Sequence, residues 1–215
     1  MIIDKNKLKA GDVLLAFSKV ANDIYLDKYN ITLCYSHAAI CTKNNMIIDS
    51  LKSGVRETTV DNLLKKYEYI SVLRNPYWDN NLLNKLHGFL ENCIKEKSKF
   101  NHKGASASTL ENRKKEHEET INEQLTDFFD GKIENKFSYK ESYFCSELIV
   151  SAFRKINIID EATSILYRPE VMCPDSLAEE PIFGHFYGYL VCDDDYQIPE
   201  TDRFYNEFRF NRQVT

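Results

Sequence analysis

The chain has 215 residues, of which 43% are hydrophobic, and its formal net charge is −5 at pH 7. This length and composition suffice for one domain with one buried core, and the acidic balance argues against a nucleic-acid partner bound through a basic face. No apolar run approaches the ~20 residues of a transmembrane helix, and the N-terminal residues lack the apolar region of a signal peptide. We therefore expect a cytoplasmic protein without a transmembrane segment, with export by a signal-independent route left open.

The first half of the chain alternates short apolar runs with helical patterns. Two apolar runs flank the turn Lys43-Asn44-Asn45 and predict a β-hairpin. Thr58 or Thr59 is a suitable N-cap for a short helix, and the next amphipathic stretch has helical spacing. The predicted elements are strand 11–17, helix 18–30, hairpin strands 35–41 and 46–50, helix 59–67, strand Tyr69–Arg74 and helix 78–97.

The second half begins with a polar segment, 98–141, that is dense in Lys, Glu and Asn. We interpret it as an insertion, helical around Glu111–Phe129, because it has too few apolar residues for a core of its own. Strong helical periodicity returns over 145–157, followed by a short helix after Pro174 and a strand over 182–191. The chain is thus predicted to be a single α+β domain, residues 1–215, with an antiparallel sheet.

Six cysteines are present, and without a secretory signal we expect free thiols that are mostly buried. Cys145 falls in the first turn of the predicted helix 145–157. The exposed N–H groups and dipole at a helix N-terminus favour an anion, so this position lowers a thiol pKa from ~8.5 toward neutral. The same N–H groups can hold an oxyanion, and Cys145 is therefore the candidate nucleophile.

His37 lies on the first hairpin strand and Asp49 on the second. If the turn takes an odd number of residues, the two side chains share one face of the sheet, whereas an even number puts them on opposite faces. On a shared face, the Asp49 carboxylate can orient the His37 imidazole, and its other nitrogen can take the thiol proton of Cys145.

The chain resembles the permuted branch of the NlpC/P60 papain-like superfamily, the YiiX-like proteins, in which the histidine precedes the cysteine. The resemblance rests on Gly11-Asp12-Val13-Leu14-Leu15, Tyr35-Ser36-His37-Ala38-Ala39-Ile40, Asp49, Gly54-Val55, Tyr143-Phe144-Cys145-Ser146-Glu147-Leu148-Ile149 and Pro174-Asp175-Ser176-Leu177-Ala178. Two departures are the long segment 98–141 and Ala38-Ala39, where the family more often has Val-Gly.

This resemblance implies a papain-like, circularly permuted fold with a small antiparallel sheet packed on the nucleophile helix. It implies Cys145 as nucleophile, His37 as base and Asp49 as third residue. We expect no cofactor and no metal. The expected reaction is hydrolysis of an amide in a peptide or amino-acid conjugate through a thioester. From their proximity to the motifs, we predict that Tyr35, Tyr143 and Ser146 bind substrate.

Other interpretations remain open at this stage. Acyl transfer or transamidation onto a lipid or protein amine, as in lecithin–retinol-acyltransferase-like relatives, uses the same nucleophile, and a lipid amide is a further possible substrate. A non-catalytic binding module could also keep the fold. His185 is an alternative base, although no carboxylate lies at hairpin distance from it. Cys34, His37 and Cys41 have ligand-like spacing, but the pairing typical of zinc sites is missing. The sequence indicates no oligomeric state.

Overall fold

The computed structural model describes residues 1–43, 46–108, 121–193 and 195–206, and the chain divides into two compact units. The sheet unit comprises Met1–Ile48, Glu57–Trp78 and Pro174–Thr215. The helical unit comprises Asp49–Arg56 and Asp79–Cys173. The α+β class is therefore confirmed, while the single domain and the papain-like arrangement stay predictions.

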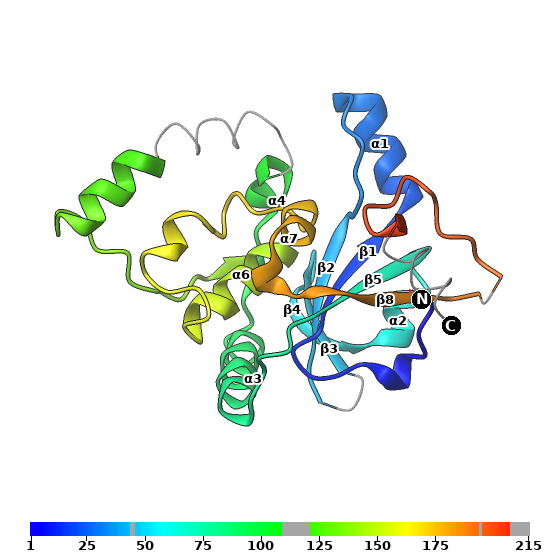
Figure 1. Cartoon of the computed structure of the whole chain (residues 1–215), viewed down its shortest axis with the longest axis horizontal. Helices are drawn as coiled ribbons and strands as arrows, with labels where there is room; N and C mark the ends of the chain where they lie inside the picture. Colours follow the sequence, from blue (N-terminus) through cyan, green and yellow to red (C-terminus); the bar gives the residue numbers. More distant parts are fainter. Residues whose placement is uncertain (44–45, 109–120, 194, 207–215) are drawn as a thin grey trace. The chain divides into compact units, whose positions relative to one another are not determined.

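Six strands form one antiparallel sheet in the order β4-β3-β2-β1-β5-β8 (Figure 1). The central strand β1 pairs with β2 on one side and with β5 on the other, and β5 pairs in turn with β8. The continuous apolar runs of the central strands are explained by this position, because both of their faces are buried. The strands are β1 Val13–Phe17, β2 His37–Cys41, β3 Met46–Leu51, β4 Gly54–Thr59, β5 Tyr69–Arg74 and β8 His185–Val191.

The helices begin where the sequence supplies an acceptor. Ser18, Thr59 and Asp79 accept hydrogen bonds from the third N–H of the helix that follows each of them, at 3.3, 3.2 and 2.7 Å. Thr59, rather than Thr58, therefore caps the short helix. The helices are η1 Lys5–Lys7, α1 Lys19–Tyr29, α2 Val60–Leu64, α3 Asn80–Lys95, α4 His102–Ser108, α6 Cys145–Lys155, η2 Thr163–Ile165, α7 Pro174–Glu179 and η3 Pro181–Phe183, with residues 121–129 also helical.

Two of the strands in the large sheet differ from the sequence prediction. Strand β4 was not predicted, since its polar Arg-Glu-Thr-Thr end carries no apolar alternation. The strand predicted over 182–191 begins at His185, because Pro181–Phe183 forms a 3-10 turn that ends at Gly184, with φ of 126°.

The polar insertion contributes structure to the helical unit. Its two ends are joined by a short parallel pair of strands, β6 Lys99–Phe100 and β7 Ser142–Tyr143, and the Lys99 N–H donates to the Glu141 carbonyl at 2.8 Å. The predicted helix Glu111–Phe129 is confirmed over 121–129, whereas 109–120 lie outside the described residues. This base of the insertion leads directly into α6.

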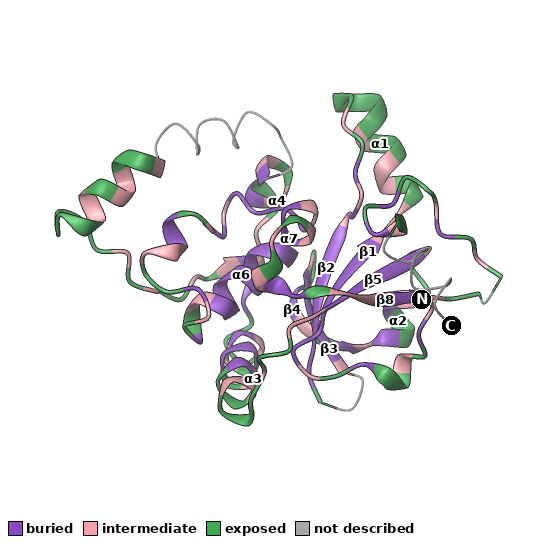
Figure 2. Ribbon diagram, in the orientation of Figure 1, coloured by how far each residue is buried: buried purple, intermediate pink, exposed green. Residues whose placement is uncertain are grey.

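Each unit has buried apolar side chains of its own. In the sheet unit, Leu14, Ile70 and Val72 belong to a cluster that α2 joins through Val60 and Leu63. In the helical unit, α3 packs on α6. Figure 2 shows the contrast between α6, whose residues from Cys145 to Phe153 are buried, and α1, which has no buried residue. No helix among the described residues is long and apolar enough to cross a membrane.

Candidate active site

Cys145 is the first residue of α6, directly after strand β7. The N-cap position is held by Phe144 in an extended conformation, with φ of −89° and ψ of 174°. A phenyl ring accepts no N–H hydrogen bond of the capping type, so no N-cap side chain accepts from the first-turn N–H groups. Cys145 itself is 9% exposed. The prediction that it lies at a helix N-terminus is confirmed.

A buried carboxylate fixes the entry into this helix. Glu147, which is 1% exposed, accepts hydrogen bonds from the Phe144 N–H at 3.0 Å and from the Asn101 amide at 3.0 Å. Its other oxygen pairs with the Lys140 ammonium at 2.9 Å. A negative charge in the first turn opposes a neighbouring thiolate, and the Lys140 ammonium compensates that charge. Because Asn101 and Lys140 belong to the insertion, the insertion holds the residue that precedes Cys145.

Glu147, Asn101 and Lys140 have no role predicted from the sequence. A signal was present for Glu147, because Glu at the third helical position is half of a capping box. The partner half is missing, since the N-cap residue is Phe144 instead of Ser or Thr. Nothing local marks Asn101 or Lys140, which are 46 and 7 residues away from Glu147.

The predicted substrate-binding residues of the helical unit are buried and hydrogen-bonded. The Ser146 hydroxyl donates to the Met172 carbonyl at 2.7 Å, and Ser146 is fully buried. The Tyr143 hydroxyl accepts from the Lys140 N–H at 2.9 Å, and burial raises the pKa of Tyr143 to about 12. The Tyr143 carbonyl accepts from the Ser50 hydroxyl at 2.6 Å. These contacts favour structural roles, and substrate binding by either residue stays a prediction.

Asp49 is fully buried on β3 and forms an ion pair with Arg56 of β4. The guanidinium donates from Nε to Oδ1 at 2.9 Å and from Nη2 to Oδ2 at 3.4 Å. Two parallel donors set the plane of the carboxylate. The sequence did not pair these two residues, although alternation along adjoining strands brings them to neighbouring positions.

His37 is the first residue of β2 and is 3% exposed. Its ring stacks on Tyr67, with centroids 5.5 Å apart and planes inclined by 4°. In the sheet, its Cα lies opposite that of Ala16 on β1. The stacked Tyr67 ring limits the planes in which the imidazole can lie.

Tyr35, the third predicted substrate-binding residue, is 1% exposed in the sheet unit. Its hydroxyl donates to Asp202 at 2.8 Å and lies 2.9 Å from the Ser71 hydroxyl, while its N–H donates to Asp175 at 2.6 Å. Burial, with the nearby Asp202 charge, raises the pKa of Tyr35. These contacts favour a structural role, and substrate binding stays a prediction.

The hairpin that carries His37 has a loop with an odd number of residues. The Thr42 N–H donates to the Met46 carbonyl at 2.8 Å, so the pairing leaves the three residues 43–45 between the strands, of which 44–45 lie outside the described residues. An odd number is the case in which His37 and Asp49 share a face. Of the predicted site residues, Cys145, Tyr143, Ser146 and Asp49 belong to the helical unit, and His37 and Tyr35 to the sheet unit.

The other cysteines differ in their surroundings. None of the six, all of which lie in described residues, forms a disulfide. Burial raises the pKa of the Cys34 and Cys93 thiols to about 11, and that of Cys41 well above its usual value. These three are therefore neutral thiols at physiological pH, which makes them poor nucleophiles.

The structure offers little support for His185 as the base or for a zinc site. His185 is exposed at the first position of β8, with its Cα opposite that of Arg74. Within the described residues, no group of three or more His, Cys, Asp and Glu side chains is placed to hold a metal ion. The zinc interpretation of Cys34, His37 and Cys41 therefore gains nothing from the structure.

No protein-family model, curated protein or solved structure matches the chain significantly. The function of the chain is therefore inferred from the chemistry of its own residues.

Proposed function

We propose that the chain is a cysteine-nucleophile hydrolase that cleaves an amide bond in a peptide or amino-acid conjugate. In this proposal Cys145 is the nucleophile, His37 is the general base and Asp49 orients His37. The observation that carries the proposal is the position of Cys145 as the first residue of α6, after an N-cap residue whose side chain has no acceptor. A thiolate and an oxyanion both gain from N–H groups at that end of a helix.

The surroundings of the three residues support these roles. Glu147 and its donors hold Phe144 in place and so limit the movement of the adjoining Cys145. Tyr67 holds the His37 ring by stacking. Arg56 holds the Asp49 carboxylate in one plane. Preorganised groups of this kind reduce the reorganisation that the reaction requires.

The proposed reaction balances as two acyl transfers. His37 takes the thiol proton, and the Cys145 sulfur attacks the amide carbonyl to form a tetrahedral oxyanion. Collapse of the oxyanion forms the thioester and breaks the C–N bond, and the leaving amine receives the proton from His37. Water then attacks the thioester, giving up a proton to His37, and the sulfur leaves with the acid product released.

Alkylation kinetics test the nucleophile and its base. The full chain is treated with iodoacetamide across a pH series, and the modified cysteine is identified by peptide mass. We expect Cys145 to react faster than Cys93 and to keep reacting at lower pH, because only a thiolate is alkylated. His37→Gln, which retains much of the side-chain volume, should shift the Cys145 profile to higher pH.

Matched controls separate this base from its rival. His185→Gln changes the exposed histidine and should leave the Cys145 profile unchanged, while Cys145→Ser should abolish the rapid phase. Equal rates for Cys145 and Cys93 in the native protein would refute the nucleophile assignment. A profile that moves with His185→Gln and not with His37→Gln would refute His37 as the base.

A further inference from the structure

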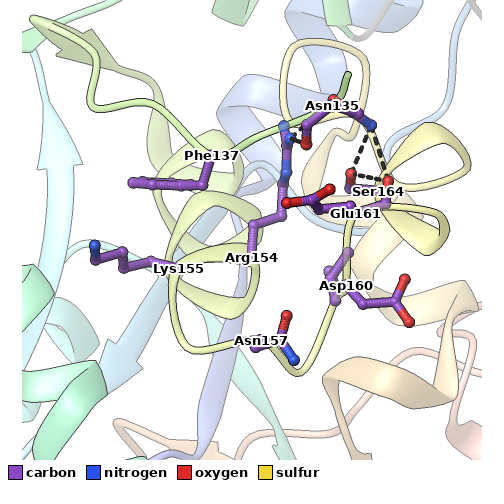
Figure 3. A pocket seen from close by; sticks show the side chains of 9 residues that line it. Asn135, Phe137, Arg154, Lys155, Asn157, Asp160, Glu161 and Ser164 are labelled. Atoms are coloured by element: carbon purple, nitrogen blue, oxygen red, sulfur yellow. Dashed lines mark hydrogen bonds between the residues drawn. The ribbon is translucent and has the colours of Figure 1, made fainter. Parts of the chain in front are cut away.

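A small pocket lies in the helical unit beside the C-terminal end of α6 (Figure 3). Its volume is about 210 Å³. The space suits a small ligand of metabolite size. The lining combines charged, amide, hydroxyl and apolar side chains: Asn135, Phe137, Arg154, Lys155, Asn157, Ile159, Asp160, Glu161 and Ser164.

Arg154 is the central cation of this pocket. Its Nη2 donates to the backbone and side-chain oxygens of Asn135 at 3.3 and 3.1 Å, and Figure 3 shows it extending toward that residue. In the part of the chain that the structure describes, Arg154 forms no ion pair with a carboxylate. Burial lowers the pKa of its guanidinium, against which the charge of Glu170 acts. A guanidinium nevertheless stays protonated in proteins, so this partly buried charge can attract an anion.

The terminal carbonyls of α6 do not need Arg154 as a hydrogen-bond partner. Basic side chains in a last turn often compensate the terminal carbonyls. Here, however, the carbonyls of Phe153 and Arg154 already accept from the N–H groups of Ile158 and Asn157, at 3.0 and 3.1 Å. Asn157, with φ of 63°, supplies the left-handed residue that such a cap requires.

Of the two carboxylates that line the pocket, Asp160 is held by hydrogen bonds from described residues and Glu161 is not. The Lys155 ammonium lies over the rings of Tyr139 and Phe137, at 5.0 and 5.4 Å from their centroids. Asp160 accepts from the N–H and hydroxyl of Thr163, each at 2.7 Å. Figure 3 shows Lys155 and Asp160 pointing to opposite sides, whereas Glu161 projects into the middle of the view.

The Glu161 side chain forms no hydrogen bond or ion pair within the described ranges. The pocket thus combines the Arg154 guanidinium, which has no carboxylate partner among the described residues, with the Glu161 carboxylate, and Phe137 and Ile159 add apolar lining. A simple anion would be attracted by Arg154 and repelled by Glu161. A ligand with both charges satisfies both residues.

We propose that this pocket binds a zwitterionic α-amino acid, with its carboxylate on Arg154, its ammonium group on Glu161 and its side chain against Phe137 and Ile159. This site is separate from the position of the proposed nucleophile. Arg154 follows Cys145 by nine residues on the same helix, which is about 14 Å along the axis. The proposal therefore stands or fails independently of the role of Cys145.

Isothermal titration of the full chain with L-leucine tests the proposal, because this amino acid has both charges and an apolar side chain. N-acetyl-L-leucine lacks the ammonium charge, and L-leucinamide lacks the carboxylate. Each should bind about ten- to a hundredfold more weakly, since each loses hydrogen bonds to a charged partner. Glu161→Gln and Arg154→Met should weaken L-leucine binding by similar factors.

Arg203→Met is the matched control, because it removes a guanidinium that does not line the pocket; it should leave binding unchanged. If Arg154→Met fails to fold, Glu161→Gln decides the test, since its side chain makes no contact that folding requires. The proposal is overturned if L-leucine shows no saturable binding, if N-acetyl-L-leucine binds as tightly as L-leucine, or if Glu161→Gln has no effect.

Discussion

Replacing Glu147 by Gln tests whether the buried carboxylate holds the start of the nucleophile helix. The native carboxylate accepts from the Phe144 N–H, the Asn101 amide and the Lys140 ammonium. Gln has nearly the same shape but a single acceptor oxygen, and its NH₂ group would face one of these donors. The substitution therefore changes hydrogen bonding and charge with little change in packing.

The expected loss of stability follows from these contacts. The ion pair contributes about 1 kcal/mol, because Lys140 is 37% exposed and regains water when the charge is removed. Phe144 and Asn101 donate to the same Glu147 oxygen, so the Gln carbonyl can keep both bonds, but each becomes neutral instead of charge-assisted, at a cost of about 1 kcal/mol each. The total of about 3 kcal/mol should lower the unfolding temperature by about 6–12 °C in a chain of this size.

Urea and thermal unfolding, followed by far-UV circular dichroism, measure this loss. The helical signal reports mainly on the helical unit, which contains α3 and α6. Glu141→Gln is the matched control, because Glu141 is exposed and its substitution should change stability by less than about 0.5 kcal/mol. If Glu147→Gln is as stable as Glu141→Gln, the carboxylate does not hold the helix start.

Three further predictions concern the charge of Lys140, the tyrosine hydroxyls around Asp202 and the pH dependence of stability. Lys140→Met leaves the Glu147 charge uncompensated and should slow alkylation of Cys145 near neutral pH, because a like charge disfavours the thiolate. Asp202→Asn should destabilise the protein by about 3 kcal/mol in urea unfolding, because the buried carboxylate accepts from the hydroxyls of Tyr35, Tyr69 and Tyr189. Stability should also fall between about pH 8.5 and about pH 11. Burial raises the folded-state pKa of Cys93 to about 11, whereas the pKa of a thiol in the unfolded chain is about 8.5. The contribution of the Cys93 thiol to the free energy of unfolding is complete below the unfolded-state pKa and is lost as the pH rises through the folded-state pKa. Urea unfolding midpoints at about pH 8 and about pH 10.5 measure this loss.

Each of these predictions has a matched control. Lys136→Met removes an ammonium that is 68% exposed and paired with Glu134, and it should leave the alkylation rate unchanged. Asp195→Asn changes an exposed carboxylate and should not alter stability. Cys93→Ala should reduce the alkaline loss of stability, whereas Cys192→Ala, at an exposed position, should not. An alkaline loss that is the same in both cysteine variants would contradict the assignment to Cys93.

The elements that local patterns predicted are confirmed where the cause of each element is local. Strand Tyr69–Arg74 and helix 145–157 follow from apolar spacing, which appears as β5 and α6 with bounds within two residues. Strand β4 could not be predicted, because its polar end is stabilised by pairing with a neighbour in the sheet and not by an apolar pattern.

In the candidate site, too, local features could be predicted and tertiary contacts could not. The place of Cys145 at a helix start was readable from spacing alone. The sequence left open whether the hairpin loop has an odd or an even number of residues, and the pairing of Thr42 with Met46 gives the odd number. The ion pair of Asp49 with Arg56, the stacking of His37 on Tyr67 and the donors to Glu147 were not. These partners depend on strand order and on the path of the insertion, which leave no periodic trace in the sequence.

The amino-acid sequence by itself determined where the helices with caps and the apolar central strands lie, because caps and hydrophobic periodicity act within a few residues. Tertiary structure alone decided which distant polar groups share a buried environment. Asp202 meets Tyr35, Tyr69 and Tyr189 across as many as 167 residues of chain. Each of these tyrosines lies in or beside a strand, so register in the sheet brings the hydroxyls to one carboxylate. Buried polar groups require partners, and the fold supplies them from wherever the backbone path passes.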